Sequence, residues 1–387
     1  MAQVVDIPAA FRDGFARARL LDAGLAERYA RHLSLGDPLA DAAVAAAATA
    51  RQRPWIQIGL DEGLAGLDDA PQALRDLFAH ATDVPYWFTQ SRTLPGCRAF
   101  HGNSRMFLAA FVAGSLVEAY STLIAKAFIT SGRLGDQAGR RFRQNNQLLS
   151  EIFLPGGLGE FGEGWKMALR IRLMHARLRL LTARSADWNH EDWGTPLNAA
   201  HIAFMNAALS GRLLERARVL GVELFPEERR AFMMIWRMAG HLTGVPAELL
   251  PRHEIEAQQL FRIGRMMEPP PEIEGIVLAN GLINSAPMAA GVDDPDLRRK
   301  LVRQLYGISR GLIGGDLATA LHFPETRGMD TLTAIRLRNR ADLLLRRHIG
   351  FYDRRRRAGQ FTQLLDLSFE GLDTGLPQAA VEDELPA

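Results

Sequence analysis

The segment from Trp165 to Leu181, WKMALRIRLMHARLRLL, combines a histidine and several arginines with bulky apolar residues. It contains neither Gly nor Pro, so it is predicted to be helical. At about 100° per residue, Arg172 and Arg179 lie about 60° and 40° from His175 around the helix. Ala168 lies about 20° from the same histidine. One face of this helix therefore joins an imidazole, two guanidinium groups and a small residue.

Two arginines that share an apolar helix face with a histidine need an anionic partner. Haem b would satisfy this face, because its iron takes an imidazole nitrogen and its propionates accept paired bonds from arginine. His175 is then the metal ligand, Arg172 and Arg179 bind the cofactor, and Ala168 lets the flat ring approach the helix. The alternative is a core histidine, with both arginines paired to Asp or Glu elsewhere in the chain. Spacing alone favours this alternative.

Two further histidines are candidate site residues. His201 lies early in the helix that Asn198 can cap, and it could act in catalysis as a second axial ligand or a distal group. A surface or cap-region role is the alternative for His201. His241 follows Trp236 in WRMAGHLTG and is a candidate for cofactor binding, the alternative being packing against the core.

Composition limits the remaining possibilities. The chain has 387 residues, 47% of them hydrophobic, and a net charge of only +2, which gives no global sign of nucleic-acid binding. Cys97 is the one cysteine, so no intrachain disulfide can form. The first residues lack the apolar core of a secretory signal, and a reducing cytoplasm is the expected location.

The sequence predicts an all-α fold, with helical periodicity almost throughout and no strand pair with turn chemistry. The segment Ser104–Gly132 is long and very apolar, enough to span a bilayer by length. Because Glu118 and Lys126 lie inside it, we expect a central buried helix instead. The protein would thus be one large helical domain around that helix, globin-like in using a haem pocket between helices.

We expect three regions along the chain. Residues 1–80 form a helical N-terminal segment, residues 81–350 form a haem-binding, oxygenase-like helical domain, and residues 351–387 form a C-terminal extension with a disordered acidic tail. The four arginines at 354–357 are a solvated helix face rather than a nucleic-acid patch.

Three motifs occur in a fixed order: RIRLMHARLR, WGTPLN and FPEERRAFMMIWRMAGHLTGVPAELLP. Together they resemble the bacterial oxygenase family typified by latex clearing protein (rubber oxygenase) and the fungal protein MpaB. The resemblance extends from Pro85 to Leu321. It implies an all-helical fold, haem b with its iron, O₂ as co-substrate, and oxidation of an apolar substrate, such as cleavage of an isoprenoid double bond.

Several positions carry the resemblance. Arg172 and His175 match the R-x-x-H position, where rubber oxygenases have an arginine and a lysine that can reach the iron. Pro196 and Asn198 match the family's P-I-N-Q, and Ala199 replaces its glutamine.

Other positions depart from the family. The proximal histidine of the rubber oxygenases would lie near Asn206 or Ala207, so that ligand is absent here. The stretch RRFRQN stands where relatives have R-R-x-x-E-T, with Gln144 and Asn145 in place of the acid and the threonine. His201 also stands where relatives usually have an acid. The acid that would act as a base therefore has no counterpart.

We therefore expect a haem b-dependent oxygenase that acts on an isoprenoid, lipid or polyketide-like small molecule, with Arg172 holding a propionate or polarising O₂. The alternative is a non-catalytic helical haem- or lipid-binding protein that kept the oxygenase fold. Retention of Arg172 and His175 favours the enzyme, and loss of the acid and threonine favours the alternative. No nucleic-acid partner and no transmembrane span are expected, while peripheral membrane contact and oligomeric state stay open.

Overall fold

The structure is a computed structural model that describes residues 7–50, 53–130, 147–325 and 332–339. Within these ranges it contains helices and no strand, which confirms the predicted all-α class. The N-terminal helices are α1 (Arg12–Leu21), α2 (Ala23–Arg31), α3 (Pro38–Thr49), α4 (Trp55–Glu62) and α5 (Gln72–Thr82). Asp22 and Asp37 cap the amino ends of α2 and α3, because each carboxylate accepts a backbone N–H three residues later. Asp22 thereby divides an apparently continuous helical sequence into two helices.

The central helices form the largest part of the fold. They are α6 (Leu94–Gly102), α7 (Ser104–Ala110), the π-helical turn η4 (Phe111–Ser115), α8 (Leu116–Tyr120), α9 (Leu123–Thr130), α11 (Glu163–Thr182), α12 (His190–Trp193), α13 (Ala199–Leu209), α14 (Gly211–Val219) and α15 (Pro226–Leu242). The C-terminal helices are α16 (Glu254–Met267), α17 (Ile273–Ala289), α18 (Pro295–Ile313) and α19 (Gly315–Ala320).

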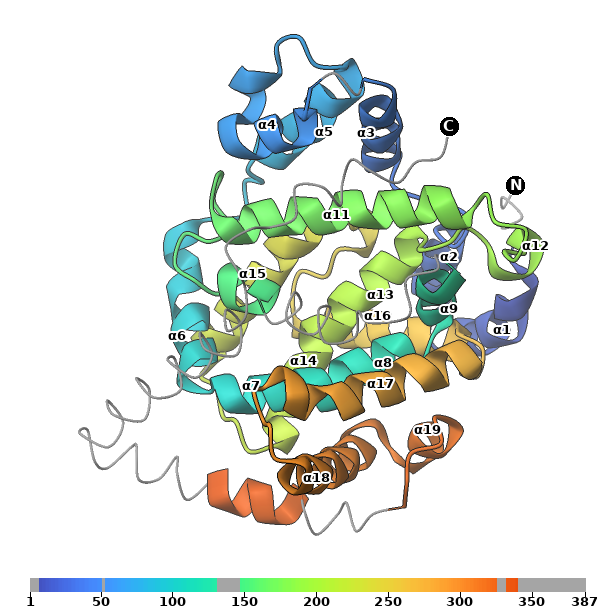
Figure 1. Cartoon of the computed structure of the whole chain (residues 1–387), viewed down its shortest axis with the longest axis vertical. Helices are drawn as coiled ribbons and strands as arrows, with labels where there is room; N and C mark the ends of the chain where they lie inside the picture. The colour runs from blue at the N-terminus through green and yellow to red at the C-terminus, as the bar shows by residue number, and fades with distance from the viewer. Residues whose placement is uncertain (1–6, 51–52, 131–146, 326–331, 340–387) are drawn as a thin grey trace.

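Helices from distant parts of the sequence pack together in the middle of the molecule. Pairs in contact are α15 with α6, α13 with α16, α14 with α16, and α11 with both α3 and α15. Figure 1 shows α11 crossing above this group, with α3, α4 and α5 at one end of the molecule and α18 and α19 at the other. Large side chains such as Trp165, Phe204 and Phe232 are fully buried in the shared core.

The long apolar segment is divided, contrary to the single central helix that the sequence predicts. Its first part runs through α7, η4 and α8, and Ser121 and Thr122 then separate it from α9, which is bent by 82° from that first part. The hydroxyls of both residues bond to carbonyls three residues earlier, a local pattern that competes with helix continuation. The segment is nevertheless buried, as expected, with Val117, Ile124 and Ala127 fully enclosed.

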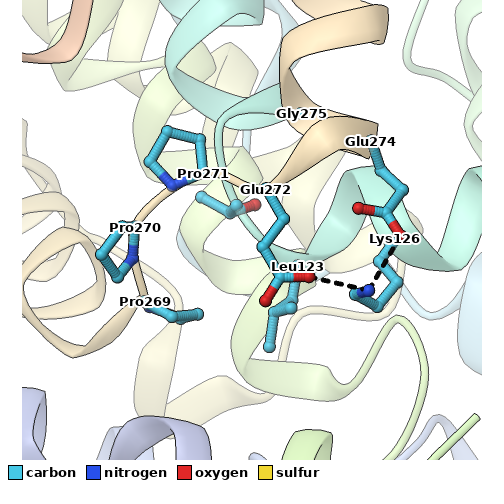
Figure 2. Close-up of a pocket in the computed structure, with 9 residues that line it drawn as sticks. Leu123, Lys126, Pro269, Pro270, Pro271, Glu272, Glu274 and Gly275 are labelled. Carbon is cyan, nitrogen blue, oxygen red and sulfur yellow. Dashed lines mark hydrogen bonds and ion pairs between the residues drawn. The ribbon is translucent and has the colours of Figure 1, made fainter. Parts of the chain in front are cut away.

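The two charged residues of this segment are neutralised inside the protein. Glu118 is 2% exposed and accepts bonds from Arg212 and Arg216 of α14. Lys126 lies between two glutamates at the start of α17 (Figure 2), with Nζ 2.8 Å from each carboxylate. In the described part of the chain no single helix has the length and apolar character to cross a membrane, although the bent pair meets the criterion together.

The N-terminal segment packs onto the rest of the described chain. Helices α1 and α2 contact α16, and α3 contacts α11, so residues before position 80 contribute to the same core. The expected domain boundaries at 80 and 350 stay predictions. Residues 351–387, including the four arginines at 354–357, lie outside the described residues.

Candidate functional site

The predicted face of α11 is buried. Ala168 is fully enclosed, His175 is 4% exposed, and Arg172 and Arg179 are each 3% exposed. A buried guanidinium stays charged and costs several kcal/mol unless it is paired. The geometry of this face therefore depends on what the two arginines contact.

Arg172 is paired with Asp37, the residue that caps α3. Its Nε donates to Oδ2 of Asp37 at 2.6 Å and its Nη2 donates to Oδ1 at 3.0 Å. The remaining nitrogen, Nη1, donates to Nδ1 of His80 at 3.2 Å. Burial alone would raise the pKa of Asp37, but the hydrogen bonds and charge of Arg172 outweigh this and lower it. Gly244 (φ +84°) allows the close approach, because a Cβ there would overlap Asp37.

Arg179 forms the second pair, with Asp41, about one turn further along α3. Its Nε and Nη2 both lie 2.9 Å from Oδ1 of Asp41. Its Nη1 donates at 2.5 Å to the carbonyl of Leu197, a fully buried residue with φ +43°. This bond holds the loop before α13 in a left-handed conformation that a leucine rarely adopts. Every nitrogen of both arginines thus has a partner. Both arginines are paired with aspartates from elsewhere in the chain, as in the alternative that the sequence left open.

His175 lies between these two arginines on a turn of α11 that contacts α9. Its ring centroid is 6.5 Å from that of Phe128, edge to face. Its Nδ1 is buried and has no hydrogen-bond partner among the described residues. Burial, helped by the positive charge of Arg179, lowers the pKa of His175 to about 3. The imidazole is therefore neutral, which is the state in which a histidine binds a metal.

His241 lies in a second histidine cluster that includes Arg172. Its ring stacks on that of His80 with centroids 4.5 Å apart and planes 22° from parallel. Burial and the charge of Arg172 lower the pKa of both histidines, that of His80 to about 4. Because a guanidinium only donates, Nδ1 of His80 accepts from Arg172 and the ring is neutral. His80 was not among the site residues that the sequence predicts. No local pattern could predict it, because it lies 92 residues before Arg172 in the chain.

His201 is fully buried and has an acidic partner. The backbone N–H of His201 donates to the side chain of Asn198, which confirms that cap. Its Nε2 lies 2.8 Å from Oε1 of Glu268, whose other oxygen accepts the N–H of Leu123 at the start of α9. An ionised carboxylate only accepts, so Nε2 is the donor. Nδ1 of His201 and the hydroxyl of Tyr29 have no partner within the described chain.

The positions where the sequence departs from the family have other roles or are not described. Asn206 donates to the carbonyl of Trp236 and so joins α13 to α15. Gln144 and Asn145 lie outside the described residues. Among residues that are described, no group of three or more His, Cys, Asp or Glu side chains is arranged to hold a metal ion.

Two hollows lie away from the α11 face. One, lined by Lys126, Glu272, Glu274 and three prolines (Figure 2), has a volume of about 10 Å³. That volume holds no more than one water molecule. The other is a groove of about 480 Å³ along the first half of α15, with Arg230, Met233 and Arg237 in its lining. None of the residues predicted for the haem site lines either hollow.

Comparisons with known proteins agree with this architecture. Residues 98–344 match the family model for the "ER-bound oxygenase mpaB/B'/Rubber oxygenase, catalytic domain". The rubber oxygenase of Streptomyces sp. (strain K30) is 22% identical over 286 residues, which are 71% of this chain and 66%, slightly under two thirds, of that protein. A solved structure of latex clearing protein LCP in the closed state has a TM-score of 0.66 at 19% identity, covering 79% of this chain and 84% of that one. At this identity, the solved structure supports the fold alone.

Proposed function

The chain belongs to the MpaB and rubber oxygenase family, and from this premise we propose that it is a haem b-dependent oxygenase of an apolar small molecule. The observation that carries the proposal is His175. It matches the family's R-x-x-H position, is buried, and keeps an unpartnered Nδ1 on a neutral ring. These properties fit an iron ligand, so we assign His175 as the residue that would hold the haem.

The two arginines fit a positioning role better than a cofactor contact. All nitrogens of Arg172 and Arg179 are occupied by Asp37, Asp41, His80 and the carbonyl of Leu197. We therefore do not assign the haem propionates to them. Instead the two pairs fix the rotation of α11 against α3 and so set the direction of His175.

His201 and Glu268 are the proposed proton-handling pair. The carboxylate holds the Nε2 proton of His201 in place, while Nδ1 is left to accept or donate a proton. Through its bond to Leu123, Glu268 is tied to α9, the helix whose Phe128 contacts the ring of His175. When bound, haem b would supply the redox chemistry that O₂ needs to react with an alkene.

The test is to express the protein with haem supplied and measure the Soret absorbance per chain. We expect His175→Leu, which keeps most of the side-chain volume, to lose haem. His101→Leu is the matched control, because His101 is a half-buried histidine whose pKa, like that of His175, is lowered by burial. Circular dichroism of both variants checks that the helices are intact. Loss of haem from both variants, or from neither, would reject the ligand assignment.

A second arm tests the reaction. The purified protein is incubated with squalene in detergent micelles under ¹⁸O₂, and labelled carbonyl products are measured by mass spectrometry. We expect label in the products of the unmodified protein and none with His175→Leu. A stable, folded protein that takes up no haem would reject the enzyme and favour the alternative, a non-catalytic helical protein that binds lipid.

A further inference from the structure

A basic groove lies along the first half of α15. Its lining comes from three segments that are distant in sequence: the chain before α6, the amino half of α15 and the start of α16. It contains five arginines and a single acid, Glu254. The five arginines are Arg92, Arg229, Arg230, Arg237 and Arg252. The groove, with a volume of about 480 Å³, is large enough for a lipid headgroup or another small ligand.

Carboxylates neutralise only part of this charge. Arg229 donates to Glu254 at 2.8 Å, and Arg252 donates to Glu256 at 2.9 Å. Across the described chain, no ion pair is formed by the other three arginines of the groove. The net charge of the whole protein is only +2, so this positive surface is a local feature.

Arg237 is the most enclosed of the unpaired arginines. Its guanidinium lies 3.9 Å from the centre of the Trp87 ring, and its Nε is buried without a hydrogen-bond partner among the described residues. Burial lowers the pKa of Arg237, although the group stays charged at neutral pH. An anion in the groove would offset this desolvation by pairing with the guanidinium.

Exposed apolar side chains lie in or next to the lining of the same groove. Ile255 is part of the lining and is 64% exposed. Tyr86, beside Trp87, is 98% exposed, and Phe225, beside Pro226, is 62% exposed. Large apolar side chains around a basic surface are typical of proteins that lie in the interface of an anionic membrane.

We propose that this face, defined by the groove and its apolar rim, docks on membranes that contain anionic lipid. A lipid phosphate would lie among Arg92, Arg230 and Arg237, and Tyr86 and Phe225 would enter the headgroup region. A membrane is favoured over a free anion because the apolar rim projects into solvent and gives a phosphate ion no additional contact. Where the oxygenase proposal also holds, docking would bring the protein to the phase in which an apolar substrate dissolves.

The experiment measures flotation of the full chain with vesicles of phosphatidylcholine, with and without phosphatidylglycerol. We expect binding only to vesicles with phosphatidylglycerol and weaker binding at high salt. The double variant Arg92→Gln/Arg230→Gln should bind about 30-fold more weakly. The control Arg17→Gln/Arg303→Gln removes the same charge from exposed positions of α1 and α18 outside the groove. It should bind like the unmodified protein.

Two results would overturn the proposal. Equal weakening by both double variants would mean that general charge, not the groove, causes binding. Calorimetric binding of inorganic phosphate without flotation on any vesicle would mean that the groove takes a free anion. Tyr86→Ser/Phe225→Ser should weaken flotation and leave phosphate binding unchanged. None of these measurements needs haem or turnover, so their failure is separate from failure of the oxygenase proposal.

Discussion

Replacing Asp37 by asparagine would leave the guanidinium of Arg172 buried without its counter-charge. Arg172 is 3% exposed, and the side chain of Asp37 is 11% exposed. Removing one partner of a buried ion pair typically costs about 3–5 kcal/mol. Asparagine keeps one acceptor oxygen for Arg172 and can still cap α3 through the N–H of Ala40. We therefore expect the free energy of unfolding to fall by about 2–3 kcal/mol.

The assay is urea unfolding followed by circular dichroism, with the midpoint and slope fitted separately. Asp41→Asn is the matched variant at the second pair. The side chain of Asp41 is 24% exposed, so water can partly replace it around Arg179. We expect Asp41→Asn to cost roughly half as much as Asp37→Asn, about 1 kcal/mol. A larger loss of unfolding free energy in Asp37→Asn than in Asp41→Asn would support burial of the carboxylate as the cause of the difference.

A double-mutant cycle with Arg172→Met isolates the pair itself. If the pair is a buried clamp, the two changes together should cost less than their sum, by about 1–3 kcal/mol. The buried clamp would be refuted if Asp37→Asn cost less than about 0.5 kcal/mol and its effect simply added to that of Arg172→Met. Repeating the measurement with haem bound gives a further result. If a propionate binds Arg172 after all, haem should reduce the cost of Asp37→Asn.

The remaining predictions concern pH and close helix contacts. His80 and His175 have pKa values of about 4 and about 3, below the ordinary 6.5, so the unfolded state binds more protons. Their contribution is full above pH 6.5 and is lost as pH falls toward 4 for His80 and toward 3 for His175. Each group should lower the unfolding free energy by about 3 kcal/mol by pH 4, and His80→Gln should flatten the profile. Gly96→Ala should destabilise by about 2 kcal/mol, because its Cβ would lie 2.7 Å from a backbone nitrogen of α15. Gly281→Ala, with nothing within 4 Å, should instead stabilise α17 by about 0.5–1 kcal/mol, and equal thermal shifts in the two variants would contradict this contact.

The sequence predicts the helices well because helical periodicity is a local property. The apolar face of α11 can be located from spacing alone, and the same spacing shows that its arginines need an anion. Spacing does not show which anion pairs with these arginines. Asp37 and Asp41 come from more than 130 residues earlier, and no local pattern connects them to α11. Only the fold places α3 alongside α11.

The break in the apolar segment illustrates a different limit. Ser121 and Thr122 are ordinary in the middle of a helix, and their apolar surroundings predict continuation. In the structure their hydroxyls bond backward to the preceding turn, while Glu268 accepts the N–H of Leu123 and so begins a new helix. That acceptor lies 145 residues later in the chain. The same glutamate is hydrogen-bonded to His201, a pairing that the sequence does not predict.

The partner of each arginine, rather than the number of arginines, separates structural positions from binding positions. Arg172 and Arg179 are almost fully buried, and carboxylates at close to 3 Å compensate for their desolvation. Arg230 and Arg237 face a groove with one acid, and neither has a carboxylate partner in the described chain. Since a charge without a carboxylate partner keeps its full capacity to bind an external anion, anion binding is expected at the arginines of the groove, whereas the arginines of α11 hold that helix rigidly against α3. Both sites share one support: α15 carries Arg237 in the groove and, one turn later, the His241 that stacks beside Arg172.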